Sequence, residues 1–200
     1  RIDQPCGIVW VDFTLREALP LDPFLPEPVF GVKIYEHPGP FGPLVDGWRG
    51  LGVNTVFAGE ALARDPGFRS LLRRNGIALF VIFPVFQDPE ALKARPELAA
   101  LTDEGRPARD EWVEFVCPSR EEFVRGKADR LAELVRASDP EAVSLDFICD
   151  FVFWEKVHPD RSPASLPRTC FCPVCLERFS RETGIALPAG LEAAPAAARW

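Results

Sequence analysis

Short apolar runs alternate with amphipathic segments along most of the chain. The runs at residues 29–35, 54–58, 77–83 and 142–151 have the length and composition of β-strands. The third run is apolar at odd and even positions alike, so both faces of that strand must be buried, as in a parallel sheet covered by helices. Repeated strand–helix units of this kind predict an α/β fold.

The amphipathic segments between these runs predict the helices. We expect them at residues 43–51, 66–74 and 119–137, with a shorter one near 89–101 and another that follows the cysteine-rich segment 170–175 and ends at about Thr183. Asn75-Gly76 provides a left-handed stop, and Ser119 with Glu122 has the pattern of a capping box. No Gly-rich phosphate loop follows any strand, which favours a (β/α)8 barrel over a dinucleotide-binding sheet.

The chain divides into two expected parts. Residues 1–28 are a proline-rich lead-in, and residues 29–200 are the barrel portion. Residues 87–114 form a long connection, which suggests inserted material over an active face. The sequence contains no methionine, and residues 190–200 read as an Ala-rich helix without a cap. We therefore expect a TIM-barrel type of α/β fold of which only the N-terminal half to two thirds is present.

Composition and charge narrow the class of partner. With 200 residues and 47% hydrophobic content, the chain can bury the core of one globular unit. The net charge of -7 and the absence of a basic cluster argue against nucleic acid. No apolar run reaches the roughly 18 residues that a membrane helix needs, so we expect a soluble protein that binds small neutral ligands. The cellular compartment is not indicated.

Cys170, Cys172 and Cys175 place three thiols within one short hook ahead of a predicted helix. Such a hook can hold three sulfurs around one tetrahedral zinc ion at roughly 2.3 Å each, so residues 170–175 are a candidate zinc-binding loop. The fourth ligand must come from another segment. The candidates are Cys117, Cys149, Cys6, His158 and His37. Cys117 is the most attractive because it lies directly before a helix, and a closed site of four thiolates would be structural.

The cysteine hook is also compatible with two roles that need no metal. The cysteines could be ordinary buried or free thiols. Cys172-Pro-Val-Cys175 ahead of a helix is also similar to a thioredoxin-type dithiol, in which the helix N-terminus lowers the pKa of the first thiol. The third cysteine, two positions earlier, argues against that redox pair.

Acidic residues after the apolar runs are candidates for the chemistry, because barrel active sites lie at the carboxyl ends of the strands. They are Glu36, Glu60, Asp88, Asp146, Asp150 and Glu155. Alternation in the fourth run puts Ser144, Asp146, Ile148 and Asp150 on one face. An Asp in so apolar a strand must be paired or functional, so Asp146 is the main candidate; the alternative is a buried Asp that ties loops or an arginine together.

Glycosidic-bond cleavage requires two carboxyl groups, about 5 Å apart for retention and further apart for inversion. Asp150 and Glu155 are the candidates to support Asp146. Glu36 and Glu60 are candidates for substrate binding, although both are also typical of charges at loop ends. Trp154 has a ring suited to stacking on a sugar face, but aromatic residues pack cores more often.

A resemblance to a known family joins these features. The chain resembles the family-42 β-galactosidases and related barrel glycosidases over roughly residues 29–184. Four features in order carry the resemblance: Cys117-Pro-Ser-Arg-Glu-Glu-Phe, a helix, an apolar strand ending in acids, and Cys-x-Cys-x2-Cys followed by Leu-Glu-Arg-Phe. The resemblance implies that Cys117 joins Cys170, Cys172 and Cys175 to bind zinc. The segment 143–148 also resembles a strand of uncharacterised glycosyl-hydrolase-like barrels, which implies that Asp146 is an active-site carboxylate.

The sequence departs from the family pattern at the acid/base position. The Asn-Glu pair of family 42 is absent, so Asp146 or Asp150 would have to substitute, and Cys149 stands where the related strand has an arginine. The family's nucleophile lies on a seventh strand that this chain does not reach. The leading expectation is a glycoside hydrolase with a structural Zn2+ and a carbohydrate substrate, acting alone or as a homo-oligomer. The alternative is a non-catalytic carbohydrate-binding or scaffold barrel with the same zinc site.

Overall fold

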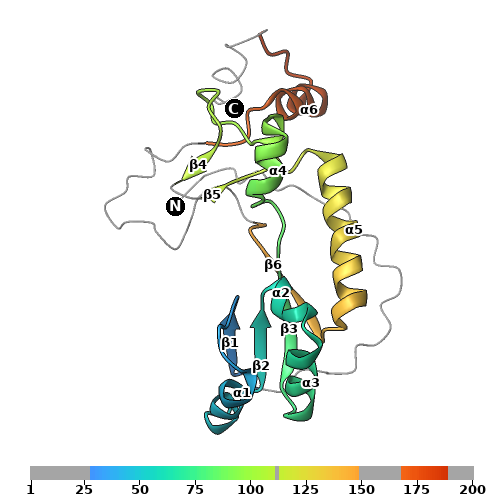
Figure 1. The fold of residues 1–200 in the computed structure, drawn as a ribbon. Coiled ribbons are helices and arrows are strands. Elements are labelled where there is room, and N and C mark those ends of the chain that lie inside the picture. The colour runs from blue at the N-terminus through green and yellow to red at the C-terminus, as the bar shows by residue number, and fades with distance from the viewer. Residues whose placement is uncertain (1–27, 111–112, 149–167, 189–200) are drawn as a thin grey trace.

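A computed structural model describes residues 28–110, 113–148 and 168–188. Its centre is a parallel sheet in the order β1-β2-β3-β6 (Figure 1). The strands are Gly31–Ile34 (β1), Thr55–Ala58 (β2), Ala78–Pro84 (β3) and Ala142–Asp146 (β6). Each of the four expected apolar runs therefore contains a strand, and the expected parallel pairing is confirmed.

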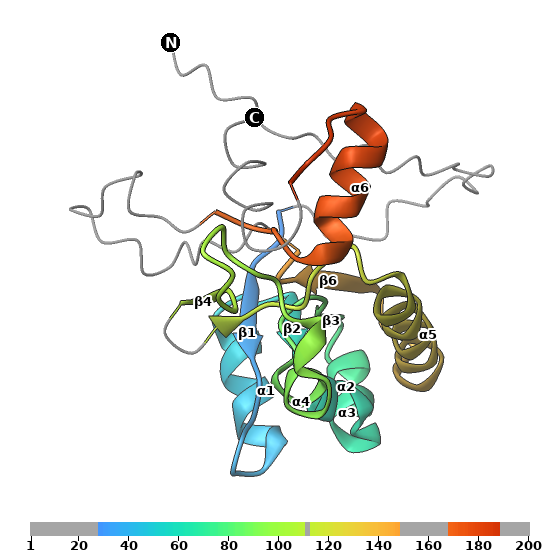
Figure 2. The same cartoon turned by 90° about the horizontal axis from the view of Figure 1, so that it is seen from above.

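Four helices cover one face of the sheet (Figures 1 and 2). They are Phe41–Gly50 (α1), Glu60–Arg64 (α2), Pro66–Arg74 (α3) and Glu121–Ser138 (α5). Val56, Val81 and Leu134 are fully buried in the core between the sheet and these helices. Local sequence determines where α3 begins. The Asp65 carboxylate accepts a hydrogen bond from the Phe68 amide at 2.7 Å, and Pro66 occupies the first turn.

The other face of the sheet is left partly open. Strand register places Lys33 beside Phe57 and Phe57 beside Phe80, and side chains of paired residues in parallel strands point to the same side. Pro84 and Asp146 are paired in the same way at the carboxyl ends of β3 and β6. In a barrel this face lines the interior, and its carboxyl-terminal rim holds the active site.

A second group of elements lies beyond the carboxyl ends of the strands (Figure 1). It contains Pro89–Ala94 (α4), the 3-10 helix Pro96–Leu98 (η1), the antiparallel pair Arg109–Asp110 (β4) and Val113–Glu114 (β5), and Pro173–Thr183 (α6). The long connection at residues 87–114 therefore does place material at this end of the sheet. None of the described helices is both long enough and apolar enough to cross a membrane.

Three local expectations are wrong. The fourth strand ends at Asp146 rather than continuing toward residue 151, because Phe147 takes a left-handed backbone conformation with φ of 51°. The shared face expected for Asp146 and Ile148 therefore does not follow from strand alternation. The capping box is also absent: Arg120 is the N-cap of α5 without a side-chain hydrogen bond, and the Ser119 hydroxyl instead accepts one from Cys175.

The third wrong expectation is the single helix near residues 89–101. Pro96 cannot donate the backbone hydrogen bond that would continue α4, so the helix ends at Ala94 and a separate 3-10 turn follows. The short helix α2 and the β4–β5 pair were not expected. The proline-rich lead-in up to residue 27 and the expected helix at 190–200 lie outside the described residues.

Candidate functional site

Four cysteines from two distant segments meet in one cluster. Cys117 follows β5, Cys170 and Cys172 precede α6, and Cys175 lies in its first turn. Their sulfur atoms all lie within 4.8 Å of one another, and the Sγ atom of Cys117 is 3.4 Å from that of Cys175 and 3.5 Å from that of Cys172. Four sulfurs at about 2.3 Å from a tetrahedral zinc ion would be separated by about 3.8 Å, so the residues present fit such an ion.

The cluster lies in an apolar setting that also fits a structural ion. Cys117 and Cys172 are fully buried, and Val113 and Phe115 pack around them. None of the four cysteines is in a disulfide. Because a set of four thiolates leaves no open position for substrate or water, an ion held here would stabilise the fold and would not act on substrate.

Backbone hydrogen bonds fix the two cysteine-bearing segments to each other. The Leu101 amide donates to the Cys170 sulfur at 3.4 Å, and the Leu101 carbonyl accepts from the Phe171 amide at 2.9 Å. The Cys117 amide donates to the Leu98 carbonyl at 2.8 Å. Such contacts orient metal-ligating side chains, and here the insertion between β3 and α5 provides them.

The thiols strongly affect one another's protonation. Hydrogen bonding with Cys117 lowers the pKa of Cys172 well below its usual range. Hydrogen bonding with Cys117, and then with Cys170, lowers the pKa of Cys175 to about 7, while hydrogen bonding with Cys170 raises that of Cys117. Hydrogen bonding with Cys117 lowers the pKa of Cys170, but hydrogen bonding with Cys172 and Cys175 prevails and raises it. The cluster therefore favours the thiolate, which is the form that binds metal, at Cys172, whereas Cys117 and Cys170 would lose their protons on binding an ion.

Asp146 ends β6 at the carboxyl-terminal rim of the sheet. One carboxylate oxygen, Oδ2, lies 3.5 Å from the Nζ atom of Lys33, and the other, Oδ1, accepts a hydrogen bond from the Phe147 amide at 3.0 Å. The Asp146 side chain is 31% exposed, so the carboxylate stays accessible. One carboxylate oxygen is therefore fixed by a backbone amide, and the other is paired with a lysine.

Lys33 contacts the candidate carboxylate of Asp146, and the sequence reasoning did not single it out. It belongs to β1, on the opposite edge of the sheet from β6, and lies 5.3 Å from the centre of the Tyr35 ring. Interaction with Tyr35, and then attraction to Asp146, raises the pKa of Lys33, so this side chain stays charged. The signal was present, because Lys33 is the only charged residue in the run 29–35. Cys149 stands where the related strand has an arginine, and the cation beside Asp146 is instead Lys33 of β1.

The remaining acidic candidates lie in different settings. Both carboxylate oxygens of Glu60 are paired, with Arg64 at 3.1 Å and Arg130 at 2.8 Å, which joins α2 to α5. Glu36 is exposed after β1. Asp88 caps α4 and is paired with Lys127 at 2.8 Å.

Asp150, Trp154 and Glu155 lie outside the described residues, and so do the alternative ligands Cys6, Cys149 and His158. His37 packs beside Phe41, with ring centres 6.1 Å apart, and is not in the cysteine cluster.

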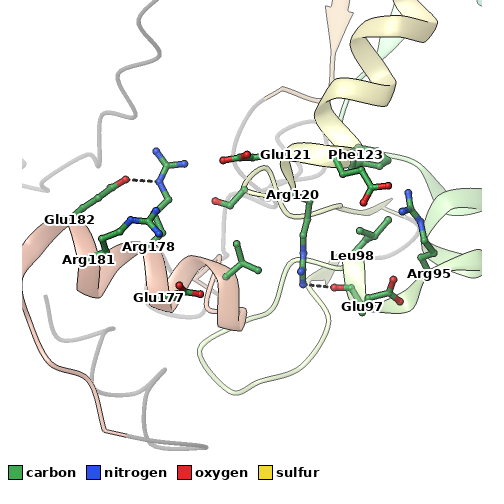
Figure 3. Close-up of a pocket in the computed structure, with 13 residues that line it drawn as sticks. Arg95, Glu97, Leu98, Arg120, Glu121, Phe123, Glu177, Arg178, Arg181 and Glu182 are labelled. Carbon is green, nitrogen blue, oxygen red and sulfur yellow. Dashed lines mark hydrogen bonds and ion pairs between the residues drawn. The ribbon is translucent and has the colours of Figure 1, made fainter.

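A cavity of about 600 Å³ opens beside the cysteine cluster rather than at Asp146. Its walls come from η1, the start of α5 and one side of α6 (Figure 3). Charged residues of both signs line it, among them Arg95, Arg120, Arg178, Glu121 and Glu177. Because Arg178 already pairs with Glu182 and the charges are mixed, the cavity does not have the apolar, convergent lining of a sugar site.

Comparison with known proteins supports the fold. No family model and no curated protein matches the sequence. Among solved structures, α-L-fucosidase isoenzyme 2 from Paenibacillus thiaminolyticus matches 84% of this chain with a TM-score of 0.56 and 13% identity. The polyextremophilic β-galactosidase from the Antarctic haloarchaeon Halorubrum lacusprofundi matches 77% with a TM-score of 0.53 and 15% identity.

The chain spans only 28% and 25% of these two proteins, respectively. The parallel α/β sheet with helices on one face therefore has the fold of part of a (β/α)8 barrel, and the expected fold class is confirmed. At such low identity the likeness concerns the fold. The resemblance to family 42 stays a prediction.

Proposed function

We propose that this chain is the N-terminal part of a glycoside hydrolase, with Asp146 as one of its active-site carboxylates. One observation carries the proposal: Asp146 lies at the carboxyl end of β6 and is paired across the sheet with Lys33 at 3.5 Å. In a barrel, this rim is where catalytic side chains gather from several strands. The fucosidase and galactosidase folds support a carbohydrate as the substrate class.

The open face of the sheet supplies further parts of a sugar site. Tyr35 is exposed near Lys33, and the rings of Phe57 and Phe80 pack edge to face with centres 5.0 Å apart. Aromatic rings stack on the apolar faces of sugars, while the lysine and the carboxylate can bind hydroxyl groups. Asp146 would act as one of the two carboxyl groups that flank the scissile bond, and Asp150 and Glu155 are the proposed support.

The four cysteines have a separate role in the proposal. Cys117, Cys170, Cys172 and Cys175 would hold a structural zinc ion, which ties the hook before α6 to the insertion between β3 and α5. Bound zinc would add stability by cross-linking these segments and would take no part in bond cleavage. The family-42 resemblance of the Cys-Pro segment supports zinc over other metals.

A second function stays in competition because the second carboxyl group is assigned only by proposal, to Asp150 or Glu155. Glu60, a candidate for substrate binding, has both oxygens engaged by Arg64 and Arg130 and does not offer them freely to a substrate at Asp146. A barrel in which neither Asp150 nor Glu155 acts as the second carboxyl group would bind carbohydrate without cleaving it. This is the non-catalytic carbohydrate-binding alternative.

The test is an assay of the full-length protein on a panel of aryl glycosides, with Asp146→Asn compared against the wild type. Loss of one catalytic carboxyl group is expected to reduce kcat by about 10²- to 10⁴-fold. Asp46→Asn, at an exposed position of α1, is the matched control and should keep full activity. Equal activity of the wild type and the Asp146 variant would disprove the assignment, and sugar binding without turnover in the wild type would favour the non-catalytic barrel.

A further inference from the structure

Phe147 holds an unusual backbone conformation directly after Asp146. Its φ is 51°, in the left-handed region that residues with a side chain seldom occupy. Such a conformation persists where surrounding contacts hold it in place, and it is often found at functional sites. The contacts of Phe147 therefore show what determines the position of the carboxylate beside it.

The backbone of Phe147 is fixed on both sides. Its amide donates to the Oδ1 atom of Asp146 at 3.0 Å, and its carbonyl accepts from the Phe86 amide at 3.2 Å. The N–H of Phe147 lies in the peptide plane that joins it to Asp146. Because the carbonyl and the ring of Phe147 are anchored, a change of φ at Phe147 must be compensated by ψ of Asp146. That compensation rotates the intervening peptide plane, moves its N–H away from Oδ1 and releases one oxygen of Asp146.

The ring of Phe147 packs into the apolar cluster that surrounds the cysteines. It meets the Phe115 ring edge to face, with centres 6.1 Å apart and an interplanar angle of 66°. Cys117 and Cys172 are buried members of the same cluster. Phe115 precedes Cys117 by two residues, and the amide of the intervening Val116 donates to the Phe86 carbonyl at 2.8 Å. One packed framework thus runs from the thiols to the Asp146 carboxylate.

We propose that Phe147 is a positioning residue through which metal binding at the four cysteines orients the Asp146 carboxylate. With the ion bound, the sulfurs and the Phe115–Cys117 segment hold one arrangement, and the Phe147 ring has a fixed surface to pack on. Without the ion, the thiols rearrange, the ring loses that surface, and the backbone relaxes out of the left-handed region. The coupling between the metal site and Asp146 does not depend on the proposed function. Only the catalytic role of the oriented carboxylate rests on it.

The test is an NMR measurement of the amide at position 147 in the full-length protein. Labelling with ¹³C-carbonyl Asp and ¹⁵N-Phe selects Asp-Phe pairs, and the Phe147→Leu variant identifies the signal. Asp146→Ala, labelled with ¹³C-carbonyl Ala in place of Asp, gives the signal position without a side-chain acceptor. Removing zinc with a chelator is expected to move the wild-type signal toward that reference and to speed its hydrogen exchange, while amides of the buried β2 and β3 strands stay unchanged.

The variant Phe147→Leu keeps the proposal testable if the zinc-free protein unfolds. With zinc bound and ¹⁵N-Leu in place of ¹⁵N-Phe, we expect the amide at position 147 of this variant to exchange its hydrogen faster than in the wild type. Where activity is measurable, we expect a loss of about 100-fold in kcat with little change in KM. Phe41→Leu is the control. It removes a half-buried ring that packs on Phe68 in the core between the sheet and its helices, and it should change neither the amide at position 147 nor kcat.

Two outcomes decide the matter. An amide signal at position 147 that does not respond to zinc removal in folded protein would overturn the coupling. So would a hydrogen-exchange rate at position 147 that is the same in zinc-bound Phe147→Leu and in the wild type. A zinc-dependent signal in a protein that hydrolyses no glycoside would support the coupling and count against the glycosidase function alone.

Discussion

At the scale of single residues, Cys117 is the least obvious member of the candidate metal centre. It is separated from the hook by more than fifty positions, yet its sulfur contacts those of Cys172 and Cys175. We predict that Cys117→Ser loses zinc, with affinity reduced by more than the about 10- to 100-fold that loss of a ligand's hydrogen-bond partner costs. Cys149→Ser is the matched control. Elemental analysis of both purified variants measures the effect, and a full zinc complement in Cys117→Ser would show another fourth ligand.

The ion pair of Asp88 and Lys127 predicts a pH dependence of stability. Burial opposes ionisation of Asp88, but hydrogen bonds from Lys127 and the Ala91 amide prevail and lower the pKa of Asp88 below its usual value. A lowered folded-state pKa contributes stability that is present above the unfolded pKa and is lost as the pH falls below it. The pair is largely buried, so its loss should cost about 2 kcal/mol near neutral pH.

The measurement compares the thermal unfolding of Lys127→Met and wild type at pH 6 and at pH 3. We expect a large difference in Tm at pH 6 that shrinks as the pH falls to 3, because Asp88 takes up its proton in the unfolded state before it does so in the folded wild type. Arg73→Met breaks an exposed pair with Asp139 and should change Tm little at either pH. An equal difference at both pH values would mean that Lys127 acts through packing on Phe83 and Phe123 rather than through its charge.

At the scale of elements, the two helix starts differ in how they are capped. Asp65 caps α3 through its side chain, whereas Ser119 bonds to Cys175 and leaves α5 without a side-chain cap. We predict that Asp65→Ala lowers the free energy of unfolding by about 1 kcal/mol. Ser119→Ala should have a smaller effect on the zinc-free protein and lower zinc affinity about 10-fold. Denaturant unfolding measures the stability of both variants, and metal competition measures their zinc affinity. If Ser119→Ala destabilised the zinc-free protein more than Asp65→Ala does, Ser119 would act as a helix cap after all.

These elements also show what the sequence could predict. Apolar runs and Asn75-Gly76 located β2, β3 and α3 because local patterning and burial agree there. The end of β6 could not be predicted, since the turn at Phe147 depends on packing against Phe115, which lies far away in the sequence. Lys33 stands out in the sequence as a charge in an apolar run, but its partner could not be predicted, because the pairing with Asp146 joins strands at opposite edges of the sheet. The cysteine spacing did predict a candidate metal site, because three of the four cysteines lie within six residues of one another in the sequence.

At the scale of the whole molecule, the described sheet has two unpaired edges, β1 and β6. Leu145 and Ile148 are about half exposed at the β6 end, and Phe30 is exposed at the β1 end. A barrel would cover such edges with further strands, and exposed apolar edges promote association. We predict that the 200-residue chain alone associates with increasing concentration, and that Leu145→Lys reduces this association.

Sedimentation velocity over a range of concentrations measures the effect. Leu51→Lys is the control, because Leu51 is 81% exposed in the turn after α1 and belongs to neither edge strand. A comparable reduction by both variants would indicate general surface hydrophobicity rather than an open sheet edge. No association of the wild type at any concentration would mean that the edges are covered.

The central claim is that Asp146 lies in the active site of a barrel that acts on carbohydrate, and one structure tests it directly. The full-length Asp146→Asn variant should be crystallised with the oligosaccharide that the wild type cleaves or binds. The account predicts that the side chain at position 146 lies about 3–3.5 Å from the anomeric carbon or the glycosidic oxygen, with Lys33 beside the same sugar. An oligosaccharide bound elsewhere, for example in the charged cavity beside α6, would contradict it.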